Sequence, residues 1–225
     1  MILESVSFTI NLLFIVTTVF TLLWIIKKLK ASKSVTILLI IWLGVQALLA
    51  KKGFYEVKDT IPPRFIFALM PALIFILYLF NATKSKAYID KISYKELTII
   101  HIVRIPVEIV LFALYTVQLV PELMTFEGAN FDIISGVTAP LIYFFVLNKE
   151  NFNKNILLGW NILCLLLLLV ILVIAILSAP TPLQHLAFDQ PNIAVFHFPF
   201  IWLPSFIVPV VLFAHLAALR KLLIK

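Results

Sequence analysis

Long runs of apolar residues limit the folds open to this chain more than any other feature. Five of these runs contain about 17 residues or more, close to the length that a helix needs to cross a hydrocarbon core of roughly 30 Å. Charged residues make up only 13% of the 225 residues, whereas a soluble domain carries roughly 25%. The sequence therefore excludes an ordinary soluble domain and predicts an all-α, polytopic transmembrane helix bundle.

Seven apolar segments are predicted to cross the bilayer, within one transmembrane domain that covers residues 1–225. The fifth segment is the shortest, because its roughly 16 residues would cover only about 24 Å as a helix. The predicted spans are residues 7–26, 34–50, 64–80, 98–119, 132–147, 156–178 and 200–219.

Lysine and arginine residues sort strongly by side once these spans are drawn. Thirteen fall in the loops of one side and four in those of the other, while Arg104 lies inside the fourth span. Positive charge collects on cytoplasmic loops, so the amino terminus is predicted to be outside and the carboxyl terminus cytoplasmic, in a plasma or inner membrane. This sorting accounts for the net charge of +7 without a nucleic-acid partner. The bilayer is the predicted partner, and association into a homo-oligomer or with a second membrane subunit is kept as an alternative.

Prolines divide the predicted spans into two groups. Each proline within a helix frees a backbone carbonyl, which must find another partner when it lies in hydrocarbon. Spans three, four, five and seven are therefore expected to form the packed interior, and the leucine-rich sixth span is expected to face lipid. The prolines concerned are Pro71, Pro106, Pro140, Pro204 and Pro209.

The fourth span carries a polar stripe formed by His101, Arg104, Glu108 and Tyr115. At 100° per residue the four side chains fall within a sector of about 60° on one helical face. Ionisable side chains at this depth are costly, and they usually mark a solute path, a proton relay or an active site. Arg104 lies one turn from Glu108, so an ion pair between them would lower the cost. We predict a buried polar site here, with a purely structural ion pair as the alternative.

His215 in the seventh span is expected at a depth similar to that of His101. Two histidines at one depth could share a metal ion or a haem. A third converging ligand and a haem-attachment motif are both missing from the sequence. No cofactor is therefore predicted, and a metal or haem held by these two histidines is kept as the alternative. His215 joins the predicted polar site.

A second candidate site is predicted at the outer surface, in the loops before the fifth and seventh spans. These loops contain acids, amides and histidines but no lysine or arginine, so the outer mouth should favour cations or neutral solutes. The alternative is an ordinary external loop in which Asp132 caps the fifth helix. The candidate outer residues are Glu127, Asn130, Asp132, His185, Asp189 and His197.

Several functions can be excluded from the sequence. The seventh span has no lysine for a retinal Schiff base, and the nucleotide-binding, serine-hydrolase and zinc-protease motifs are absent. The leading hypothesis is a small-solute or proton-coupled permease with its buried polar site on span four. The alternatives are a membrane-embedded enzyme for a lipid-like substrate, with or without a metal ion, and a scaffold or accessory membrane subunit.

Overall fold

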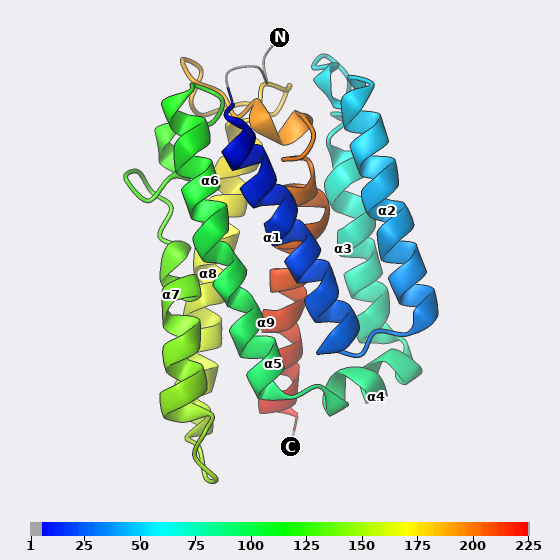
Figure 1. Ribbon diagram of the computed structural model, residues 1–225, viewed down its shortest axis with the longest axis vertical. Coiled ribbons are helices and arrows are strands. Elements are labelled where there is room, and N and C mark those ends of the chain that lie inside the picture. The colour runs from blue at the N-terminus through cyan, green and yellow to red at the C-terminus, as the bar shows by residue number, and fades with distance from the viewer. Residues whose placement is uncertain (1–5, 225) are drawn as a thin grey trace.

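The chain forms a bundle of long helices (Figure 1). The computed structural model describes residues 6–224, and these contain helices and turns but no strand. The predicted all-α class is therefore confirmed. The main helices are α1 (Phe8–Lys27), α2 (Lys33–Lys51), α3 (Ile66–Asn81), α4 (Thr83–Lys91), α5 (Tyr94–Ile99), α6 (Arg104–Thr116), α7 (Ile133–Leu141), α8 (Lys154–Leu177) and α9 (Val208–Leu223).

Five helical segments within residues 6–224 are long and apolar enough to cross a membrane. A sixth is added if α3 and α4, which meet at an angle of 88°, are counted as one broken span. The α5 and α6 helices form one of the five segments through the short 3₁₀ helix η3 (Ile100–Val103). The α7 helix and its π-helical extension η5 (Ile142–Val146) have only nine and five residues. The helical part of the predicted fifth segment, Ile133–Val146, is therefore shorter than these five segments and is not counted among them.

Local polar side chains complete the backbone hydrogen bonding of α1 and α2. The hydroxyls of Ser7 and Ser32 accept hydrogen bonds from the first free amides of the two helices. Within α1, the hydroxyls of Thr17, Thr18 and Thr21 donate to carbonyls four residues earlier. These threonines therefore leave no hydroxyl unpaired inside an apolar helix.

Burial is concentrated in two of the apolar segments. In the segment that joins α5 to α6, 61% of the apolar stretch is buried, and in the segment that ends with α9 the share is 50%. The corresponding share is 17% for both α2 and α8. The interior position predicted for spans four and seven is confirmed, as is the peripheral position of span six. The interior position predicted for span three is wrong, since only Ala68, Leu69 and Ile76 are buried in α3.

The α7 helix approaches the start of α6 very closely at Gly136. A Cβ atom added there would lie 2.9 Å from Ile105 Cγ1 and 3.1 Å from the Ile105 backbone nitrogen. Glycine thus permits a contact that a larger residue would block. In Figure 1, α7 begins about halfway along the bundle, well below the upper end of α6. The first residues of α7 therefore lie beside Arg104, deep in the molecule.

Candidate functional site

Arg104 is the centre of a buried polar cluster at the meeting point of α6, α7, α8 and α9. Its Nη1 atom donates a hydrogen bond of 2.5 Å to Oδ1 of Asp132, the residue that precedes α7. Its Nη2 atom lies 3.1 Å from Nε2 of His215 in α9. Only 2% of the Arg104 surface is exposed. A single guanidinium therefore connects a carboxylate of α7 with an imidazole of α9.

The partners of His215 determine its tautomer. A guanidinium can only donate, so Nε2 of His215 must accept the hydrogen bond from Arg104. The proton of the ring then lies on Nδ1, which donates to Oδ1 of Asn161 at 3.0 Å. His215 is consequently neutral in this arrangement, because a second ring proton would point at the guanidinium.

His101 lies against His215 in a stack of aromatic rings. The centroids of the two imidazoles are 3.9 Å apart with an interplanar angle of 20°, and the Trp160 ring lies edge-on to His101 at 5.5 Å. Trp160 is fixed in turn by a 2.9 Å hydrogen bond from its Nε1 to Thr138 Oγ1. His101 is fully buried, yet neither of its ring nitrogens has a hydrogen-bond partner among the described residues.

Glu108 lies one turn beyond Arg104 in α6, where Asn130 holds it. Asn130 Nδ2 donates to Oε1 of Glu108 at 2.6 Å and to the Met124 carbonyl at 3.0 Å. The Asn130 side-chain oxygen accepts from the backbone nitrogen of Asp132 at 3.0 Å. Oε2 of Glu108 is buried without a partner. Asn130 thus connects the Glu108 carboxylate to the segment that precedes α7.

The structure brings together most of the polar site expected from span four. His101, Arg104 and Glu108 lie in one cluster with His215. Arg104 and Glu108 do not form the expected pair with each other, because the first pairs with Asp132 and the second with Asn130. Tyr115 lies outside the cluster, and its hydroxyl donates to Glu122 Oε2 at 3.4 Å.

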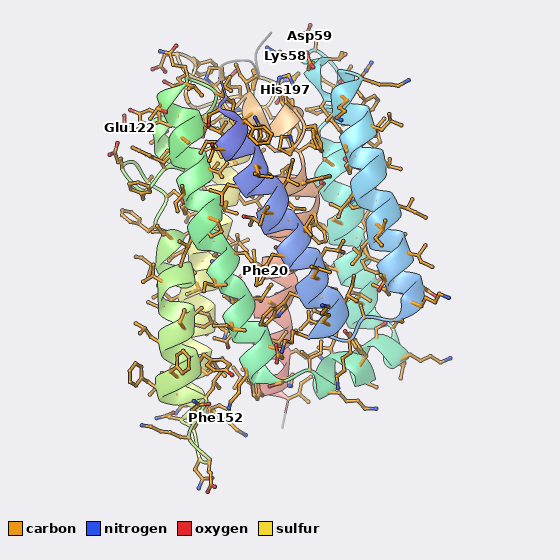
Figure 2. All side chains as sticks on the ribbon, viewed as in Figure 1. Phe20, Lys58, Asp59, Glu122, Phe152 and His197 are labelled. Carbon is orange, nitrogen blue, oxygen red and sulfur yellow. The ribbon has the colours of Figure 1, made fainter. Side chains whose placement is uncertain are left out.

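The six residues of the expected outer site do not gather in one place. Asn130 and Asp132 turn inward and belong to the buried cluster, because α7 begins deep beside Arg104. Glu127, His185 and Asp189 are exposed on the surface. His197 is nearly buried, and its Nδ1 lies 3.4 Å from Glu56 Oε1. Figure 2 shows His197 at the same end of the bundle as Lys58.

The environment of His197 predicts how stability depends on pH. Burial lowers the pKa of His197 below its ordinary value, Glu56 opposes this shift, and Lys58 adds to it. As the pH falls through about 6.5, the unfolded chain therefore binds a proton at this position before the folded protein does. The stability linked to neutral His197 is complete above that pH and is lost below it.

We expect the H197Q variant to show a smaller decrease in melting temperature than the wild type when the pH is lowered from about 7.5 to about 5.5. The measurement is the Tm of the detergent-purified proteins at both pH values. An equal decrease in the two proteins would contradict this interpretation of His197.

The two histidines do not fit a shared metal ion or haem. Their rings are stacked nearly parallel, so their nitrogens do not converge on one point, and both nitrogens of His215 already have partners. Among the described residues, no group of three or more histidine, cysteine, aspartate and glutamate side chains could hold a metal.

Residues from α7 and α8 were not anticipated as members of the cluster. Asn161 bonds to His215, Trp160 lies against His101, and the hydroxyl of Ser135 lies 3.5 Å from Asp132 Oδ1. A signal existed for Asn161, which is the one amide side chain between residues 156 and 178. Polar residues in such a run need a partner inside the protein.

These features define an all-helical protein in which apolar helices, long enough to span a membrane, enclose a polar cluster. The model of a family described as a domain of unknown function (DUF8737) matches residues 63–223, so the chain belongs to this family. The match begins after α2 and includes every residue of the cluster. No curated protein and no solved structure is significantly similar to the chain.

Proposed function

We propose that this protein is a small proton-coupled permease and that the buried cluster is its solute- and proton-binding site, closed to both sides in the present conformation. The observation that carries this proposal is a concentration of unpaired polar atoms. Eight buried side-chain atoms among residues 6–224 have no hydrogen-bond partner, and four of them belong to His101, Arg104 and Glu108. Buried polar atoms are nearly always paired in proteins, so these four have capacity for a solute, a water molecule or a proton.

Irregular helices around the cluster support the proposal. His101 lies in the 3₁₀ segment η3, and the π-helical segments η5 and η7 (Leu203–Ile207) adjoin α7 and α9. Such interruptions often mark functional sites, and transporters place their binding sites at discontinuous helices. The α1 and α2 helices are continuous and contribute no residue to the cluster.

The shared position of Arg104 offers a means of coupling to protons. If His215 gained a second ring proton, that proton would face the guanidinium and the hydrogen bond between them would break. Arg104 would then be held by Asp132 alone, and its freed N–H would be available to a solute. The other groups that face His215 are His101, Trp160 and Asn161, and none of them carries a negative charge to compensate.

The enzyme alternative would require the polar site to open laterally toward lipid. A surface groove of about 410 Å³ does run between α1 and the junction of η3 with α6. Its lining contains no residue of the cluster, so lipid in this groove would not meet the polar groups. The lining residues are Leu13, Val16, Thr17, Phe20, Ile102, Val103, Ile105 and Pro106. A scaffold subunit, the remaining alternative, would have no use for the unpaired atoms.

We further propose seven crossings in a plasma or inner membrane, with the amino terminus outside. The start of α1 and the end of α9 lie at opposite ends of the bundle (Figure 1), which an odd number of crossings requires. Phe152, between α7 and α8, lies at the end opposite to Lys58 and His197 (Figure 2). The short α7 and η5 helices would then complete the fifth crossing together with the segment that descends to Asp132.

Cysteine labelling tests this topology. Single cysteines at Lys58, Lys84, Lys149 and Asp189, all exposed positions, are introduced into a C164A background. On intact cells, a membrane-impermeant maleimide should label positions 58 and 189 but neither 84 nor 149. If the fifth segment did not cross, positions 58 and 149 would be labelled instead, and seven crossings would be excluded.

Solute accumulation in proteoliposomes tests the permease. Radiolabelled amino acids, short carboxylates and small sugars are offered to vesicles with an imposed pH gradient. We expect at least one of these classes to accumulate in vesicles that contain the protein, and a protonophore to abolish the accumulation. Failure of all three classes, with the protein shown to be folded by its thermal transition, would count against a small-solute permease.

A further inference from the structure

We propose that α4 and the lysine-rich end of α1 bind the headgroups of anionic phospholipids at the cytoplasmic surface of the membrane. The binding surface, here called the basic platform, contains seven lysines on α4, at the end of α1, in the turn after α1 and at the start of α2. The inference uses the proposed topology and does not depend on transport activity. The seven residues are Lys27, Lys28, Lys30, Lys33, Lys84, Lys86 and Lys91.

The orientation of α4 places it in the plane of a membrane surface. It meets α3 at 88° and lies across the lower end of the bundle in Figure 1. A helix that runs across the bundle at this end would lie where headgroups are found. Its lysines Lys84 and Lys91 are exposed and Lys86 is half-buried.

Several contacts hold α4 firmly in this position. Ile89 is completely buried, and the hydroxyl of Tyr88 donates to the Leu29 carbonyl in the turn after α1. Arg220 of α9 makes two hydrogen bonds to Asp90, of 3.1 and 3.2 Å. These contacts join the two halves of the basic platform into one surface. They also neutralise Asp90, which is the one acidic residue of α4.

Ion pairs among the described residues do not balance the charge of the basic platform. No ion pair joins any of the seven lysines to another residue between 6 and 224. Lysines held at the end of the bundle where headgroups lie complement the negative charge of a cytoplasmic leaflet. Each lysine near the membrane surface strengthens binding roughly fivefold. Trp24 lies beside this surface, with the Lys28 ammonium 5.9 Å from its ring centroid. Tryptophan is enriched at the headgroup level of membranes.

Lipid nanodiscs provide the test, with the full chain incorporated in phosphatidylcholine alone or in phosphatidylcholine mixed with phosphatidylglycerol. We expect phosphatidylglycerol to raise the melting temperature of the wild type by about 5 °C and added salt to reduce this gain. The K84Q/K86Q/K91Q variant should lose more than half of the gain. A second variant, K27Q/K28Q/K30Q/K33Q, examines the other half of the surface should the first not fold.

The matched control is the K51Q/K52Q/K58Q variant, which removes three exposed lysines from the opposite end of the bundle and should keep the full gain. The proposal fails if the wild type does not respond to phosphatidylglycerol, or if the platform variants respond as strongly as the control. It also fails if inorganic phosphate added to phosphatidylcholine discs produces the same gain, since the ligand would then be a free anion. None of these results depends on solute accumulation, so the permease is tested separately.

Discussion

Replacing Arg104 with glutamine is expected to lower the melting temperature of the purified protein by about 10 °C. The substitution leaves the buried Asp132 carboxylate without its cation, which lies 2.5 Å away in the wild type. Breaking a buried ion pair from one side costs about 3–5 kcal/mol, and 1 kcal/mol corresponds to about 2–4 °C in a protein of this size. The measurement is thermal unfolding in detergent.

Two further variants distinguish the effect of breaking the buried ion pair on the melting temperature from a general effect of removing an arginine. The R104Q/D132N double variant removes both charges and should recover more than half of the lost stability. The R64Q variant is the matched control, because Arg64 is half-buried and stacks on Phe54 just before the start of α3. Its melting temperature should fall by no more than about 3 °C. Losses that simply add in the double variant would show that Arg104 and Asp132 do not interact.

Replacing Glu108 with glutamine is expected to reduce proton-driven solute accumulation by roughly 100-fold while the melting temperature changes little. Glutamine retains a side-chain oxygen that can accept the hydrogen bond from Asn130, so the packing of the cluster is preserved. Glutamine cannot gain or lose a proton, so the substitution removes any proton exchange at the unpaired Oε2 of Glu108. The measurement is accumulation in proteoliposomes under an imposed pH gradient.

The E127Q variant serves as the control for this experiment, since Glu127 is an exposed carboxylate in the segment between α6 and α7. It should accumulate solute as the wild type does. If E108Q were as unstable as R104Q, the role of Glu108 would be structural. If E108Q accumulated solute normally, Glu108 would have no part in proton coupling.

Helix register explains why much of the site could be predicted from the sequence. The positions of His101, Arg104 and Glu108 on one face follow from the spacing of residues in a single helix, and all three lie in the cluster. Long apolar runs likewise predicted the all-helical class and the shortness of the fifth segment. These features depend only on local geometry, which a sequence pattern contains.

The partners of these residues depend on packing between helices, which the sequence pattern does not contain. Asn130 and Asp132 were expected at the outer surface, because they lie between the predicted fourth span and the apolar run of the fifth. They lie inside because Gly136 lets α7 begin deep beside α6, and Asp132 thereby replaces Glu108 as the partner of Arg104. The interior position predicted for α3 from its proline was wrong for a similar reason. The carbonyl that a proline frees does not require the whole helix to be buried.

Proton uptake measured directly tests the central claim, which is that the buried cluster couples protons to a solute. Proteoliposomes that contain a pH-sensitive dye are given the accumulated solute without an imposed pH gradient. Our account predicts that the solute acidifies the interior of wild-type vesicles and has no effect on vesicles that contain E108Q. Solute entry without acidification in the wild type, or equal acidification in both, would contradict it.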